Sequence, residues 1–165
     1  MSEARGLTPA EKTRLAYNAS IRLLARRDHS VAELNRKLRQ REHDQTSIDS
    51  CMEELIDANY VNDRRYAELY VEQRIEKGFG PLAIRAKLYE RGIDSSLTRC
   101  AFEVVGADWT QLATHLIHKR FNAEDIVGSD QRTIARIVRF VQGRGFNAGD
   151  VARALKEARK DLKDG

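Results

Sequence analysis

Arginine is the residue type through which this sequence could do chemistry. Lysine and arginine together number 29, against 25 aspartates and glutamates in 165 residues, which gives a net charge of +4. Arg132, Arg136 and Arg139 recur at helical spacing opposite an apolar stripe. Such a row of guanidinium groups can bind phosphates or carboxylates through paired hydrogen bonds. A solvated helix face that uses arginine for its helix propensity accounts for the same spacing.

Further basic residues gather in the middle of the chain, whereas residues 47–63 carry acids and no base. An isoelectric point near 9.2 is compatible with nucleic acid or with an acidic protein as the partner, and it does not decide between them. We therefore predict a basic surface that faces nucleic acid or an acidic partner. The candidate residues are Arg74, Arg85, Lys87, Arg132, Arg136 and Arg139.

A search for catalytic groups gives no candidate. The sequence has no glycine-rich loop followed by Lys-Ser or Lys-Thr, and the glycines at 78–80 fit a turn between helices better than a nucleotide fingerprint. His115 and His118 lie one helical turn apart, but no carboxylate or cysteine stands near them in sequence to complete a metal site. We predict no catalytic residue, no metal and no cofactor.

The distribution of apolar residues bears on where the protein works. No stretch approaches the roughly 20 apolar residues that a membrane helix needs. The first residues also lack the apolar core of a signal peptide. We therefore expect a cytoplasmic protein without membrane contact. We also expect a monomer.

A short turn sequence occurs three times and organises the chain. Residues 91–94 read Arg-Gly-Ile-Asp, residues 144–147 read Arg-Gly-Phe-Asn, and residues 41–44 give a diverged copy, Arg-Glu-His-Asp. A period near 50 residues is typical of a tandem repeat. The arginine that opens each copy would complement the negative end of the helix before it.

The apolar residues after each copy follow one spacing, which predicts the inner face of a helix. They are Ile48, Cys51, Met52 and Leu55, then Leu97, Cys100, Ala101 and Val104, and then Val151, Ala154, Leu155 and Ala158. In this alignment the two cysteines share one position with an alanine, so we interpret them as small buried contacts rather than a disulfide. The predicted core residues are Cys51, Leu55, Leu97, Cys100, Val104, Val151 and Leu155.

Capping residues mark the starts of the helices. Thr8 and Ser30 each stand three residues before a glutamate, which is a capping box, and Ser129 is a candidate cap for a later helix. The pattern predicts helices over residues 9–27, 31–41, 47–59, 63–77, 81–91, 95–105, 109–120, 130–142 and 148–162, with a loop over 121–129. We predict an all-α fold of three tandem three-helix repeats, 1–60, 61–106 and 107–165, in an elongated, curved array.

Several motifs follow one another between about residues 15 and 160. They are Arg27-Asp28-His29-Ser30 with Glu33-Leu34 and Lys37-Leu38, Tyr60-Val61-Asn62-Asp63 with Tyr66-Ala67, Gly78-Phe79-Gly80-Pro81 with Ile84, Leu88 and Arg91-Gly92-Ile93, and Asp108-Trp109 with Ala113 and Lys119-Arg120-Phe121. In this order they resemble the RecX family of regulatory proteins. The first turn departs from the pattern, because Glu42 and His43 replace the glycine and the apolar residue of the other copies.

The resemblance implies a non-enzymatic negative modulator of the RecA recombinase. Members of this family bind the RecA filament on single-stranded DNA and suppress its ATPase, co-protease and strand-exchange activities, which affects DNA repair and the SOS response. The resemblance supplies no binding residues, so the predicted surface depends on the basic residues alone. The alternative is a protein that binds nucleic acid directly and independently of RecA, with strong and salt-dependent affinity.

Overall fold

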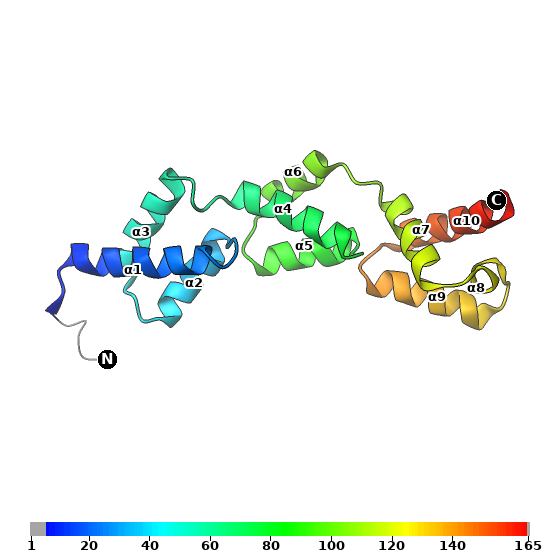
Figure 1. Cartoon of the computed structure of the whole chain (residues 1–165), viewed down its shortest axis with the longest axis horizontal. Helices are drawn as coiled ribbons and strands as arrows, with labels where there is room; N and C mark the ends of the chain where they lie inside the picture. Colours follow the sequence, from blue (N-terminus) through cyan, green and yellow to red (C-terminus); the bar gives the residue numbers. More distant parts are fainter. Residues whose placement is uncertain (1–5, 165) are drawn as a thin grey trace. The chain divides into compact units, whose positions relative to one another are not determined.

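The computed structural model describes residues 6–164, and the regular elements among these residues are helices without any strand (Figure 1). The helices are Pro9–Leu24 (α1), Val31–Gln40 (α2), Gln45–Asp57 (α3), Asp63–Glu76 (α4), Pro81–Glu90 (α5), Ser95–Val105 (α6), Trp109–Arg120 (α7), Ala123–Val127 (α8), Gln131–Gly143 (α9) and Ala148–Asp164 (α10). The all-α prediction is confirmed. The short helix α8 lies where the sequence predicted a loop.

The chain packs as two compact units. One comprises the residues up to 67 together with 89–97, and the other comprises 68–88 together with the residues from 98 onward. The second repeat therefore contributes to both units. The boundaries expected from the sequence, 1–60, 61–106 and 107–165, stay a prediction, as does the curvature of the array, and residues 1–5 and 165 of these ranges lie outside the described part.

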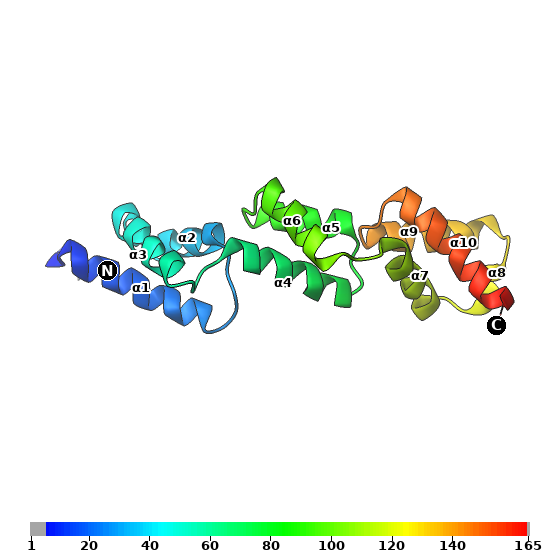
Figure 2. The same ribbon diagram turned by 90° about the horizontal axis from the view of Figure 1, so that it is seen from above.

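In the first unit α1, α2 and α3 pack as one group (Figure 2). Thr8 and Ser30 cap α1 and α2, and each forms the expected reciprocal box with the glutamate three residues later. The inner faces of the three helices share a core of fully or nearly fully buried side chains. This core consists of Ala16, Leu23, Leu34, Leu38, Ile48, Cys51, Met52, Leu55 and Val61.

In the second unit α10 packs mainly against α7, and α8 and α9 close the same core. That core consists of Ala113, Ile117, Ile126, Ile137, Val141, Phe146, Val151, Ala154, Leu155 and Ala158. Asn122 caps α8, and its Ile126 is buried. Asp130 and not Ser129 caps α9. The insertion of α8 thus adds an apolar side chain to the core of the third repeat.

The inner face of α6 is displaced by one residue from the predicted one. Thr98 and Ala101 are buried, whereas Leu97 and Cys100 are half-buried and Val104 is 59% exposed. The turn copies at 41 and 91 are separated by 50 residues, so Cys51 corresponds to Ala101 and not to Cys100. The prediction that Val104 lies in the core is therefore wrong, because the buried face of the second copy contains Thr98 and Ala101 and leaves Val104 exposed. Among the other predicted core residues, Cys51, Leu55, Val151 and Leu155 are buried.

The three turns share a left-handed residue. Gly92 and Gly145 have φ values of +75° and +93°, and Glu42 occupies the same position at +63°. A side chain in this region costs about 1 kcal/mol or more relative to glycine. None of the described helices is long and apolar enough to cross a membrane.

Candidate functional site

The six predicted basic residues all lie in the second unit. On α9 the side chains of Arg132, Arg136 and Arg139 are exposed. Arg136 is held in place, because its Nη2 lies 2.9 Å from Asp125 Oδ2 and its guanidinium carbon lies 5.5 Å from the Phe121 ring centroid. The helix therefore presents an exposed arginine row in which the middle member is already paired.

Arg74 and Lys87 line one small apolar cavity of about 210 Å³. Tyr70 and Phe79 contribute aromatic rings to its wall, and the Arg74 guanidinium carbon lies 4.9 and 5.4 Å from their ring centroids. Guanidinium stacking of this kind fixes the side chain while its N–H edges stay available to an anion. The structure thus brings two of the predicted residues together around an apolar cavity.

Arg85 stacks on a different ring, with its guanidinium carbon 4.6 Å from the Phe102 centroid. Arg120 lies in a similar way 5.8 and 5.7 Å from the centroids of Phe121 and Phe140. In these pairs the arginine covers an aromatic face that a nucleic-acid base would otherwise stack on. The arrangement favours contacts with carboxylates or phosphates over base stacking.

The turn arginines have a role beyond the interaction with a helix end that the sequence predicts. In the first unit Arg91 Nη1 donates to Glu33 Oε1 at 2.9 Å and to the Tyr66 hydroxyl at 2.6 Å. The carbonyl of Arg91 also accepts a hydrogen bond of 2.5 Å from Ser30 Oγ. Arg91 therefore fastens the turn of the second repeat onto the start of α2 in the first repeat.

In the same way, Arg144 fastens the turn of the third repeat onto the second repeat. Its Nε donates to the Gly78 carbonyl at 3.1 Å, its Nη2 donates to the Lys77 carbonyl, and its guanidinium carbon lies 4.2 Å from the Phe79 ring centroid. The Gly80 N–H donates to the Arg144 carbonyl at 2.7 Å. In the sequence, the recurrence of Arg-Gly one period apart was the signal for this connection. Complementing the end of a helix is only part of the role of the turn arginine.

A buried polar network surrounds the first of these joints. Glu33 is 4% exposed and receives hydrogen bonds from Arg27 as well as Arg91. Burial opposes ionisation of this carboxyl, but the hydrogen bonds from Arg27 and the charge of Arg91 hold its pKa below the ordinary value. Burial, reinforced by Arg27, lowers the pKa of His29, whose Nε2 lies 2.9 Å from Lys37 Nζ. A neutral His29 is therefore the form that can accept a hydrogen bond from Lys37.

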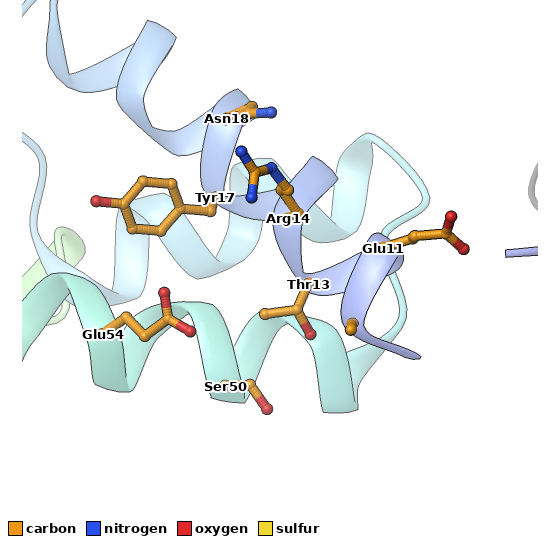
Figure 3. Close-up of a pocket in the computed structure, with 8 residues that line it drawn as sticks. Glu11, Thr13, Arg14, Tyr17, Asn18, Ser50 and Glu54 are labelled. Atoms are coloured by element: carbon orange, nitrogen blue, oxygen red, sulfur yellow. The ribbon is translucent and has the colours of Figure 1, made fainter. Parts of the chain in front are cut away.

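The largest of the grooves described here, about 700 Å³, lies between α1 and α3. Figure 3 shows Arg14 and Tyr17 on α1, with Ser50 and Glu54 on α3. Its lining combines one arginine with two glutamates and includes no histidine, lysine or cysteine. The described lining of this groove therefore has no excess of positive charge that would favour an anion.

The predicted histidine pair does not form a cluster of metal ligands. His118 Nε2 lies 3.1 Å from Asp161 Oδ2, and His115 is exposed. Across residues 6–164 no group of three or more histidine, cysteine, aspartate or glutamate side chains is placed to hold a metal ion.

Two family models match the sequence. The model described as RecX, first three-helix domain, matches residues 16–55, and the model described as RecX, second three-helix domain, matches residues 62–101. The chain is also 40% identical over 139 residues to the regulatory protein RecX of Chromohalobacter salexigens, an alignment that covers 84% of this chain and 90% of the relative. The chain belongs to the RecX family. The RecX of Halorhodospira halophila is 34% identical over 165 residues, which is 100% of this chain and 98% of that protein.

Solved structures of RecX proteins share this fold. The crystal structure of RecX from Lactobacillus salivarius aligns with a TM-score of 0.77 at 24% identity, over 90% of this chain and 97% of that one. A second crystal structure, of a regulatory protein RecX, gives a TM-score of 0.76 at 21% identity, over 90% and 74%. The arrangement in three-helix repeats is thus common to this RecX-family chain and its structural relatives.

Proposed function

We propose that this RecX-family chain is a negative modulator of the RecA recombinase. It binds the RecA filament on single-stranded DNA and inhibits ATP hydrolysis, co-protease activity and strand exchange, and so influences DNA repair and the SOS response. It acts by binding and not by catalysis, as a monomer in the cytoplasm. The observation that carries the proposal is the match to both RecX three-helix domain models, supported by relatives named regulatory protein RecX along the whole chain.

The contacting surface in this proposal includes the six basic residues of the second unit. Three of them lie on the exposed face of α9, and two flank an apolar cavity where a partner's apolar side chain could insert. Apolar anchors beside arginines are typical of the parts of protein interfaces that contribute most to affinity. These features support a protein partner as the main ligand of the surface.

The function is tested by titrating the chain into RecA assembled on single-stranded DNA while ATP hydrolysis is followed. To test the surface, Arg132→Glu, Arg136→Glu and Arg139→Glu are combined, with Lys156→Glu, Lys160→Glu and Lys163→Glu on exposed positions of α10 as the matched control. Reversal of the α9 charges is expected to weaken inhibition by at least about tenfold, since like charges then face the partner. Equal inhibition by both triple variants would remove α9 from the binding surface.

Direct binding of nucleic acid, without RecA, is the second candidate. The exposed Arg132 and Arg139 favour it, because guanidinium groups also bind phosphates. This function predicts tight binding of the isolated chain to DNA that weakens steeply with salt. The RecA function predicts weak binding to DNA alone and strong inhibition of a preformed filament.

A further inference from the structure

Two grooves occupy equivalent places in the first and the third repeat. One lies between α1 and the turn after α2 and measures about 430 Å³, and the other lies between α7 and the turn after α9 and measures about 420 Å³. The fully buried Ala16 and Ala113 align the two first helices, and the turn copies align the rest. The paired lining residues are Leu15 and Leu112, Ala19 and Leu116, Arg22 and Lys119, Leu23 and Arg120, Arg41 and Arg144, and His43 and Phe146.

The groove of the third repeat is bounded on one side by a polypeptide segment of the preceding repeat. Residues 75–78, from the second repeat, form one of its walls. Arg144 holds this segment through the carbonyls of Lys77 and Gly78. The fit is close, since a Cβ added at Gly78 would lie 3.3 Å from Leu116 Cδ1. In this groove the arginine of the turn therefore binds main-chain carbonyl groups of a polypeptide segment.

The corresponding groove of the first repeat is lined by the first repeat alone. Its lining residues are Leu15, Ala19, Arg22, Leu23, Arg26, Arg41 and His43. The three arginines have no carboxylate partner within residues 6–164, and no carboxylate lines the groove. Burial and the charge of Arg41 lower the pKa of His43, so the positive charge comes from the arginines.

The two acids beside this turn, Glu42 and Asp44, do not line the groove, although the charge of Asp44 acts on His43. Asp44 is engaged in capping α3, where its carboxylate accepts from the Ser47 N–H at 3.0 Å. Glu42 is exposed and does not line the groove. Arg22 Nε donates to the Asn18 carbonyl at 3.3 Å, but no carboxylate partner holds any of the three guanidinium groups among the described residues. A groove lined by these groups together with Leu15, Ala19 and Leu23 is complementary to a segment that carries both carboxylates and apolar side chains.

We propose that the groove between α1 and the first turn docks an acidic polypeptide segment of the partner protein, in the manner in which the third repeat holds residues 75–78. Taking RecA as that partner rests on the proposed function. A polypeptide is favoured over a phosphodiester because the equivalent groove receives main-chain carbonyls and because Leu15 and Leu23 give this one an apolar surface.

A second copy of this chain is a poorer occupant. Within the chain, Gly92 and Gly145 pack so tightly against Ala32 and Ala83 that a Cβ added at either glycine would overlap the alanine Cβ. Glu42 occupies the same position in the first turn. Its side chain obstructs the close approach through which one repeat docks onto another, whereas a more extended segment that lies along α1 avoids it.

The first test uses the full chain labelled with nitrogen-15 and two probes of matched charge, a short poly-glutamate peptide and an oligothymidylate. Poly-glutamate is expected to shift the amide signals of Arg22, Arg26, Arg41 and His43 more than the oligothymidylate does. Larger shifts there with the oligothymidylate would overturn the polypeptide assignment in favour of a phosphodiester. Shifts spread evenly over all basic residues would overturn the groove as a site.

The second test measures binding to RecA assembled on single-stranded DNA. Arg22→Gln with Arg26→Gln removes two groove charges, and Arg14→Gln with Arg36→Gln removes two exposed charges outside the groove from the same repeat. The groove variant is expected to lose at least about tenfold in affinity, while the control stays within about twofold of the natural chain. Equal affinities of the two variants would overturn the proposal.

Failure of the proposed function is recognised separately. If the natural chain does not bind RecA, the RecA function is contradicted, and the poly-glutamate titration alone decides whether the groove takes an acidic segment. Sedimentation of the natural chain as an oligomer that the groove variant abolishes would identify a second copy as the occupant and overturn the proposal.

Discussion

At the scale of single residues, the turn arginine and the glycine after it act together. Arg91 binds Glu33 at the start of α2, and Arg144 binds the carbonyls of Lys77 and Gly78 before α5. The glycine after each arginine lets the two backbones meet without a side chain between them. Both glycines have positive φ, where any other residue is strained. The Arg-Gly pair is therefore required for packing between repeats as well as for ending a helix.

Replacing Gly145 by alanine is expected to destabilise the chain by about 2 kcal/mol or more, because the new Cβ meets Ala83 and the left-handed backbone is strained. Gly143→Ala is the matched control, since it lies in α9 and a Cβ there meets nothing within 4 Å. That control is expected to stabilise by roughly 0.5–1 kcal/mol. Urea unfolding measures both, and equal stabilities of the two variants would contradict tight packing at the turn.

The His29 and Glu33 network predicts a fall in stability on acidification. Because the pKa of His29 is lowered on folding, the unfolded chain takes up a proton first as the pH falls through its ordinary value of 6.5, and stability decreases from there. Glu33 contributes stability above its ordinary pKa of 4.5, and this contribution is lost as the pH falls further through its lowered pKa.

Thermal unfolding of the natural chain and of His29→Gln between pH 7 and pH 5 tests this prediction. The natural chain is expected to lose stability over this range, and the variant is expected to lose less. His115→Gln, at an exposed position on α7, serves as the control and is expected to follow the natural chain. A variant His29→Gln with an unchanged pH dependence would show that His29 does not carry the effect.

At the scale of helices, sequence periodicity and capping residues were sufficient to predict the all-α architecture. They were not sufficient to predict which face of every helix is buried. The capping boxes at Thr8 and Ser30 locate two helix starts. In each box a short oxygen-bearing side chain accepts a hydrogen bond from the backbone N–H of the glutamate three residues later, and this spacing is visible in the sequence. The face of α6 was misassigned because Leu97 and Val104 are apolar, whereas the buried position is taken by a threonine, Thr98. Helix α8 was missed since five residues are too few to show a period.

The corrected register has a measurable consequence. Val104→Ala is expected to change stability by no more than about 0.5 kcal/mol, because the side chain is 59% exposed. Leu55→Ala at the fully buried end of α3 is expected to cost roughly 2–5 kcal/mol through the cavity that it leaves. Chemical unfolding compares the two variants. A loss of unfolding free energy for Val104→Ala close to that for Leu55→Ala would support the register predicted from the sequence, in which Val104 lies in the core.

The candidate surface was less accessible to sequence reasoning than the fold. Arginines at helical spacing on α9 identify an exposed face, but the sequence does not show that Arg136 pairs with Asp125 or that Arg85 stacks on Phe102. The groove lined by Arg22, Arg26 and Arg41 also could not be predicted from the sequence. Its lining comes from two segments that only the fold brings together, and its meaning emerges only from comparison with the third repeat.

At the scale of the whole molecule, the repeats are alike in their inner faces and different in their charges. The same helix positions are buried after the first and third turns. The first groove is lined by three arginines, whereas residues 75–78 form a wall of the third. Repeats that share a core pattern and differ outside are suited to contacting several positions on a large partner. This organisation supports a regulator that works through its surface.

The most direct test of this function is to add the chain to RecA already assembled on single-stranded DNA and to follow ATP hydrolysis. We predict progressive inhibition that is complete at or below one chain per RecA protomer, together with weak binding of the chain to the same DNA without RecA. Undiminished hydrolysis at that ratio would contradict the proposed function.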